Sequence, residues 1–271
     1  MSDVGQKLIC ELVDDFRGKV KAEIKRHVNA IPIDLIEPQV HSVLGALLAR
    51  QGTIAIELAQ AVSAWNYHSA PLFIRAMVDA HITIAWLMLD PKDRSKKYVE
   101  YGLGQSKLHL EHLKSDLTSR GIDHQKDESI QEMEAWLNAQ KLMFLLPVEL
   151  GSWSNISTRE MAIEAGLENA YNFSYQPFSG CVHSTWNHIS QYNARRSESP
   201  LHRHTFVAAM PEFPPDAHQL DTVARWLDET LVLYQKQYDL PEEKHLIKEW
   251  LHIALNEMAA KTKSECVEMD L

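Results

Sequence analysis

The chain has 271 residues, 45% of them apolar and 24% charged, with a formal net charge of −10 at pH 7. This composition is ordinary for a globular protein, and its acidity disfavours broad adhesion to nucleic acid or anionic membrane. The three cysteines are far apart and include no CxxC pair, which argues against both a disulfide framework and a cysteine zinc site. We therefore expect a cytoplasmic protein that does not enter a membrane.

Helix-forming residues fill long stretches with few glycines or prolines between them. The expected fold is all-α: a multi-helix bundle with a buried central helix and little or no sheet. Apolar residues at helical spacing predict, in the first half of the chain, helices at about 4–28, 39–64, 72–89, 90–118 and 129–143. The segment 72–89 is apolar on nearly all sides, which predicts that it is the buried central helix.

The second half of the chain contains more residues that start, end or break helices. The motif "STRE", Ser157 to Glu160, predicts a capping box at the start of a short helix, and Gly166 suits its C-terminal cap. Pro177 predicts a kink near 173–177, followed by a helix over 178–194. An irregular segment follows, and then two final helices at about 220–238 and 241–261. The apolar face of the last helix could close the core or form an oligomer contact.

Two charged residues interrupt the central helix. Arg75 and Asp79 are one turn apart and share a helix face, so they can pair. One hypothesis is a buried ion pair that fixes the register of the helix. The other gives Arg75 an anionic ligand and leaves Asp79 to orient that ligand or to accept a proton.

A second group of polar residues recurs at every fourth position in "YNFSYQPFSGCVHSTW". Tyr171, Tyr175, Ser179 and His183 would form one stripe on a helix. A Ser-His pair on a helix is more often a hydrogen bond than a catalytic dyad, and no glycine-rich elbow presents Ser179. His183 is the candidate general acid or base. The tyrosines and Ser179 are the candidate substrate-binding groups.

The segment "ARRSESPLHRH", residues 194–204, is the one dense cationic run. It is either a solvated, exposed loop or a phosphate-binding patch that uses Arg195 and Arg196. Arg196 with His202 fits the R-x4–6-H pattern of HEPN-type ribonucleases, and so does Arg75 with His81, but with 14 histidines the pattern carries little information. On one helix, His81 would also lie away from the face of Arg75.

The other candidate sites are weaker. His109 and His112 are three residues apart on an expected helix, without the HExxH spacing of a specific zinc site. We expect no metal and no cofactor. The seven tryptophans are interpreted as core residues because most lie in or beside expected helices.

These features together resemble a widespread bacterial helical domain family of unknown function. The resemblance rests on "RAMVD", on "KYVEYGLGQSK", and on the segment from Trp153 to His183, which fits the pattern Y-x3-Y-x3-S-x3-H. It covers roughly residues 71–187. It implies a mainly helical fold, and the ends of the chain lie outside the resemblance. We expect a single helical domain over 1–271, with 71–187 as the family-like core and peripheral helices in 1–38 and 216–271. The resemblance also implies that Arg75 and Asp79 face the Tyr-Ser-His stripe, and that the protein acts in phage defence or as a toxin.

Three hypotheses for function follow. The first is a metal-independent, HEPN-like ribonuclease in which Arg75 or the basic segment 194–204 stabilises phosphate charge and His183 transfers protons. The second is a non-catalytic helical interaction module, in which the same residues form a buried network and the terminal helices bind a partner protein or a second copy. The third is a nucleotide or small-anion sensor clamped by Arg75. RNA, a nucleotide and a protein are accordingly the expected partners.

Overall fold

The computed structural model describes residues 3–144, 156–243 and 246–269, and its fold is all-α, as predicted. The first half of the chain contains α1 (Asp3–Val28), α2 (Pro38–Gln60), η1 (Val62–Ala64), α3 (Ala70–Met88), α4 (Pro91–Ser119), η2 (His124–Lys126) and α5 (Glu128–Phe144). The second half contains α6 (Thr158–Glu164), α7 (Glu168–Ala170), η3 (Tyr171–Tyr175), α8 (Gln176–Val182), α9 (Trp186–Tyr192), β1 (Ala194–Arg196), η4 (Pro200–His202), β2 (Phe206–Ala208), α10 (His218–Gln237) and α11 (Leu246–Met269).

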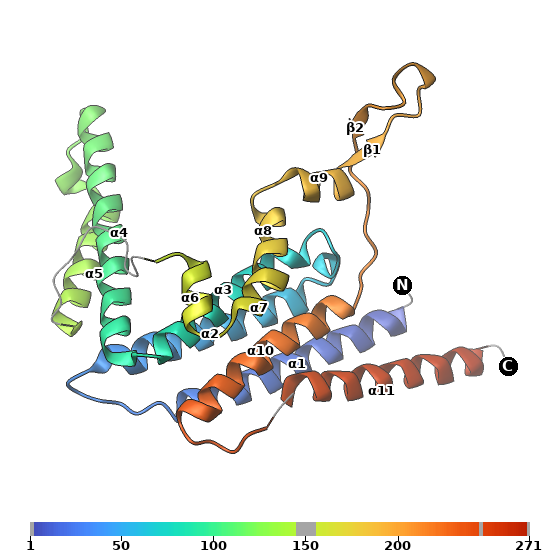
Figure 1. Ribbon diagram of the computed structural model, residues 1–271, viewed down its shortest axis with the longest axis horizontal. Helices are drawn as coiled ribbons and strands as arrows, with labels where there is room; N and C mark the ends of the chain where they lie inside the picture. The colour runs from blue at the N-terminus through green and yellow to red at the C-terminus, as the bar shows by residue number, and fades with distance from the viewer. Residues whose placement is uncertain (1–2, 145–155, 244–245, 270–271) are drawn as a thin grey trace.

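The main body is built from five long helices. α1, α2, α3, α10 and α11 run side by side, and α3 contacts both α2 and α10 (Figure 1). α3 is the buried central helix that its composition predicts, with Ile74, Met77 and Leu87 almost completely enclosed. Both terminal segments also contribute to this core, since Phe16 of α1 and Leu227 of α10 are fully buried.

The apolar face of α11 closes the core. Ile247 and Leu251 are fully buried, and Trp250, Leu255 and Met258 pack against the same cluster. Of the two uses proposed for this face, the structure therefore supports core closure.

Two projections rise from the body. One is the α4–α5 pair, which has a small apolar cluster of its own that includes Leu103, Leu110 and Ile130. The other consists of α8, α9 and the β1–β2 hairpin, residues 176–208, and is called the hairpin arm below (Figure 1).

Two expectations for residues 171–208 are corrected, and a third gains detail. The expected helix over 178–194 is broken, because α8 ends at Val182 and Ser184 adopts a left-handed φ of 50° before α9 begins. The region of the expected kink, 173–177, contains the end of a π-helical turn, η3, and the start of α8. The segment after Ala194 is not wholly irregular, since β1 and β2 pair as antiparallel strands with Arg196 opposite Phe206.

The remaining differences concern helix ends and tryptophans. Residues 241–243 are not helical, and α11 is described from Leu246, whereas the last helix was expected from about Pro241. Trp65, Trp86 and Trp226 are buried as expected, whereas Trp136 and Trp186 are 49% and 62% exposed.

Two core helices resemble membrane spans in length and composition. α2 and α3 are long and apolar enough to span a membrane, but 56% and 61% of their most apolar stretches are buried inside the protein. Packing in the core therefore accounts for their hydrophobicity.

Candidate functional site

Arg75 connects the central helix to the hairpin arm. It lies on α3, which packs against both η3 and α8. Its Nε donates a hydrogen bond of 2.8 Å to Ser179 Oγ, and the Ser179 hydroxyl donates in turn to the Tyr175 carbonyl oxygen at 2.7 Å. The hydroxyl proton of Ser179 is therefore engaged by the backbone of its own helix, which makes Ser179 a poor nucleophile and a good acceptor for arginine.

The face of the guanidinium is also covered. Arg75 Cζ lies 3.1 Å from the centroid of the Tyr175 ring, a cation–π contact. The Tyr171 ring stacks on Tyr175 with centroids 4.8 Å apart and an angle of 19° between the planes. The Tyr175 hydroxyl donates to Thr158 Oγ1 at 3.3 Å, which connects the stack to the first residue of α6. The side chain of Arg75 consequently keeps only 13% of its surface exposed.

Asp79 completes the cluster from the solvent side. Arg75 Nη1 lies 3.6 Å from Asp79 Oδ1, and the Asp79 side chain is 49% exposed. Burial of the carboxyl raises the pKa of Asp79, and the nearby cations Arg75 and Arg50 oppose that rise. The predicted proximity of Arg75, Asp79, Tyr175 and Ser179 is confirmed, and these four residues with Tyr171 are called the Arg75 network below.

His183 lies apart from the Arg75 network. It occupies the C-terminal cap of α8, where only its backbone N–H is engaged, by the Ser179 carbonyl at 2.9 Å. Its imidazole is exposed and forms no hydrogen bond or ion pair with any residue that the structure describes. The fourfold stripe thus ends at Ser179, because the helix that would continue it stops at Val182.

The other candidate residues lie elsewhere. Arg195 and Arg196 are exposed on β1, and Arg195 pairs with Glu198 at 3.6 Å. His81 is buried on another face of α3, with its Nδ1 2.8 Å from Thr230 Oγ1, so it does not join Arg75. Trp153 falls outside the described residues. No group of three metal-ligating side chains occurs within 3–144, 156–243 and 246–269.

Some features of this region were not predicted from the sequence. Tyr171 and Tyr175 stack across a π-helical turn, and no residue pattern in the sequence indicates such a turn. A second pair, His68 Nδ1 and His188 Nε2, lies 3.2 Å apart with stacked rings at the base of the hairpin arm. The exposure of Trp186 was also missed, although its polar neighbours in "HSTWNH" were a signal.

Comparison with known proteins adds a family but no activity. Residues 41–200 match a model described as "Family of unknown function (DUF5677)", a range that contains the Arg75 network and the first strand of the hairpin. No curated protein and no solved structure matches the chain significantly.

Proposed function

We propose that this chain, which belongs to the DUF5677 family of unknown function, is a non-catalytic helical binding module. In this proposal the Arg75 network holds the hairpin arm on the body, and the hairpin arm presents its surface to a partner. One observation carries the proposal: the Arg75 guanidinium is engaged on its face and on two of its nitrogens by the protein's own groups and is 13% exposed.

The argument turns on what a catalytic or anion-binding arginine requires. A guanidinium that stabilises phosphate must direct free donors toward the ligand. Here Nε donates to Ser179, Nη1 faces Asp79 and the ring of Tyr175 covers the face. A cation bound in this way stabilises packing between α3 and α8, which favours a structural role over an anion clamp.

A ribonuclease is the competing proposal, and one observation favours it. Asp79 lies beside Arg75, is half exposed and has a raised pKa, which are properties of a proton-transfer group. In that mechanism Asp79 would work with His183, whose exposed imidazole is free to reach a ligand. Mutations that leave stability unchanged can separate this catalytic role from a structural one.

The biological setting is also a proposal. The family resemblance supports a role in bacterial phage defence or as a toxin, in the cytoplasm. A binding module would serve such a system by recognising RNA, a nucleotide or a protein rather than by cutting it. Because the apolar face of α11 is used in the core, the hairpin arm is a better candidate contact surface than the terminal helices.

Two substitutions separate the structural role from a catalytic one. Arg75→Lys keeps the charge but removes the planar fork and its stacking face, so we expect unfolding to become easier by about 1–3 kcal/mol. His183→Ala should leave stability within about 0.5 kcal/mol, because the side chain is exposed and unbonded. Thermal and denaturant unfolding measure both effects.

A matched control and a cleavage assay complete the test. Arg120 forms an i,i+4 ion pair with Asp116 at 3.2 Å, with both side chains 61% exposed, so Arg120→Lys should change stability little. The parent chain should leave labelled RNA intact. Cleavage by the parent, abolished in His183→Ala or Asp79→Asn without loss of stability, would refute the proposal and support the ribonuclease.

A further inference from the structure

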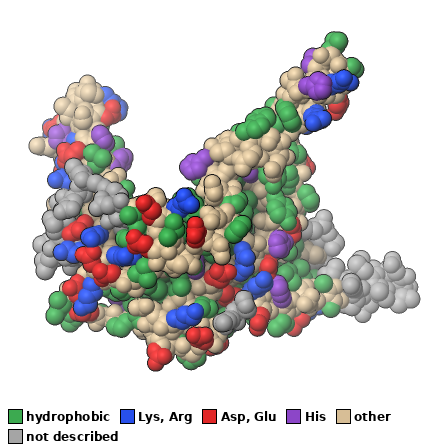
Figure 2. Space-filling view, viewed as in Figure 1, with side chains coloured by type: hydrophobic (Ala, Val, Ile, Leu, Met, Phe, Trp, Pro, Cys, Tyr) green, Lys and Arg blue, Asp and Glu red, His purple; other side chains and the backbone are tan. Residues whose placement is uncertain are grey.

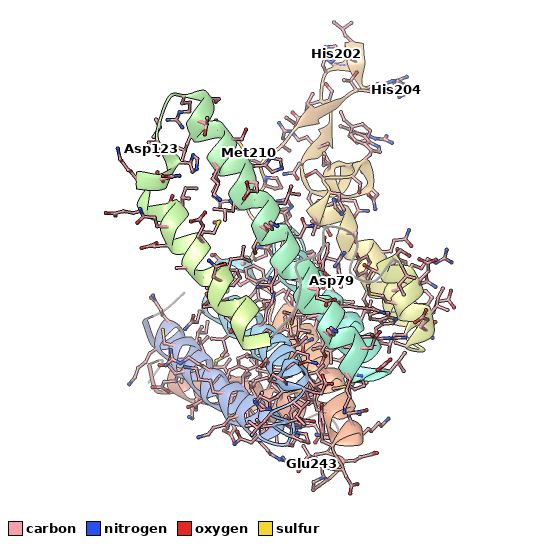
Figure 3. The ribbon with its side chains drawn as sticks, turned by 90° about the vertical axis from the view of Figure 1, so that its left-hand side faces the viewer. Asp79, Asp123, His202, His204, Met210 and Glu243 are labelled. Atoms are coloured by element: carbon pink, nitrogen blue, oxygen red, sulfur yellow. The ribbon has the colours of Figure 1, made fainter. Side chains whose placement is uncertain are left out.

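The hairpin at the end of the hairpin arm, residues 194–208, has a net charge opposite in sign to that of the whole chain. Residues 194–208 include three arginines and one glutamate, a formal charge of +2, whereas the whole chain has −10. His202 and His204 lie at the tip, away from the body (Figure 3). In the space-filling view, Lys or Arg and His side chains gather with apolar ones at this end (Figure 2).

The arginines differ in how they are engaged. Arg195 pairs with Glu198 at 3.6 Å. Arg196 and Arg203 are exposed, and neither forms an ion pair with any residue in the described part of the chain. Two guanidinium groups therefore keep their donors free for an anionic ligand, in contrast to Arg75.

One face of the hairpin adds aromatic rings to this charge. Directly opposed residues of an antiparallel pair project from the same face, so Arg196 lies beside Phe206. The Phe206 ring meets Trp186 edge to face, with centroids 5.6 Å apart and an angle of 90° between the planes. Phe206 and Trp186 are 44% and 62% exposed. Ala194 and Ala208 form the neighbouring pair on this face, and both have small side chains.

The base of the hairpin arm fixes this face relative to the body. His188 and Tyr192 of α9 pack with His68, which precedes α3, and with Phe213, which precedes α10. The Cys181 thiol donates to the His68 carbonyl oxygen at 3.2 Å. The exposed rings and arginines are thus carried on an anchored support.

We infer that the hairpin arm binds single-stranded nucleic acid through Arg196, Arg203, Phe206 and Trp186. Arginine contacts phosphate, and exposed aromatic rings stack on unpaired bases, so free guanidinium groups beside two rings match both parts of this ligand. A duplex offers no free base face, and the acidic body would repel an extended one. The inference rests on the proposed binding function and names its partner class.

The test measures binding of a fluorescein-labelled oligouridine to the full chain by anisotropy, across a range of salt concentrations. We expect Arg196→Gln with Arg203→Gln to weaken binding by about tenfold or more, and to lower the slope of log affinity against log salt by roughly 1.4, since two phosphate contacts are lost. Trp186→Leu should weaken binding by about fivefold to a hundredfold, because it removes one stacking platform. Arg120→Gln, an exposed arginine on the α4–α5 pair, is the matched control and should bind like the parent.

Other outcomes are equally informative. Equal affinity in the parent and in the Arg196, Arg203 double variant, or no binding by the parent, would overturn the inference. If the double variant instead changes the sedimentation of the unliganded chain, the hairpin arm contacts a second copy and the inference is also wrong. Denaturing gels report whether oligouridine is shortened, which would contradict the proposed function, and oligodeoxyuridine then measures binding by the hairpin arm without RNA cleavage.

Discussion

At the scale of single residues, two charged or titratable groups on α3 have opposite surroundings. Arg75 is surrounded by partners from η3 and α8, whereas His81 is fully buried with one ring nitrogen near Thr230 and Nε2 without a partner in the described structure. Sequence spacing predicted the pairing of Arg75 with Asp79, because four residues make one helical turn. It could not predict the partner of His81, since Thr230 is on α10, far along the chain.

The buried His81 gives a prediction about pH. Burial lowers the pKa of His81 from 6.5 to about 4. Between these values the unfolded chain binds a proton that the folded chain does not, so stability is present above pH 6.5 and is lost as pH falls toward 4. Through this group, the free energy of unfolding should fall by about 2 kcal/mol between pH 7 and pH 5.

His81→Leu should remove that part of the pH dependence, and urea unfolding at the two pH values measures it. The Thr230 hydroxyl keeps its bond to the Trp226 carbonyl oxygen in this variant. His109→Leu, at an exposed position on α4, is the control and should follow the parent. An unchanged pH dependence in His81→Leu would mean that His81 is protonated in the folded chain.

At the scale of elements, local signals predicted helix starts better than helix interruptions. The capping box of Ser157 and Glu160 forms as its sequence predicts, and Gly166 ends α6 with a φ of +70°. These features depend on residues within one turn of each other.

The break at Ser184 is also local: the backbone N–H groups of Ser184 and Thr185 donate to the carbonyl oxygens of Cys181 and Gly180, at 3.4 and 3.0 Å. It was missed because the left-handed position is occupied by serine, where glycine is the usual residue. No signal in the sequence predicted the π-helical turn.

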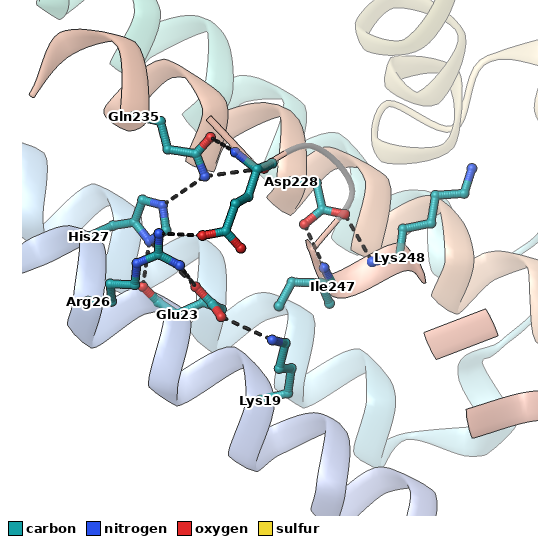
Figure 4. Close-up of polar contacts among 9 residues, drawn as sticks. Lys19, Glu23, Arg26, His27, Asp228, Gln235, Ile247 and Lys248 are labelled. Atoms are coloured by element: carbon teal, nitrogen blue, oxygen red, sulfur yellow. Dashed lines mark hydrogen bonds and ion pairs between the residues drawn. The ribbon is translucent and has the colours of Figure 1, made fainter. Parts of the chain in front are cut away.

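The start of α11 depends on a buried side chain from another helix. Asp228 of α10 accepts hydrogen bonds from the backbone N–H groups of Ile247 and Lys248, each at 2.9 Å, beside a polar cluster that joins α1 to α10 (Figure 4). Asp228→Ala would leave these donors without their acceptor and should cost about 1–2 kcal/mol.

Hydrogen exchange locates that effect. Amides of α11 should exchange faster in Asp228→Ala, while those of α2 and α3 keep their protection. Asp228→Asn retains one acceptor oxygen and should give an intermediate result. Uniform loss of protection across all helices would contradict a local capping role.

At the scale of the whole molecule, composition predicted the all-α class, and the apolar run 72–89 predicted the central helix. The shape was not predictable, because the two projections and the body differ in what packs around them rather than in helix propensity (Figure 1). The candidate site was half predicted: its members on α3 and α8 meet, but His183 does not join them. The missing information is the left-handed conformation of Ser184, which ends α8 at Val182 and which its residue type does not predict.

The central claim is that Arg75 and Ser179 act together to hold the hairpin arm on the body. A double-mutant cycle with Arg75→Gln and Ser179→Ala, measured by denaturant unfolding, tests this claim most directly. We predict a coupling energy of about 1 kcal/mol or more, since the bond joins a largely buried cation to its acceptor. If the stability lost in the double variant equals the sum of the two single losses to within about 0.3–0.5 kcal/mol, the two side chains do not cooperate. The account of Arg75 as a structural link would then be wrong.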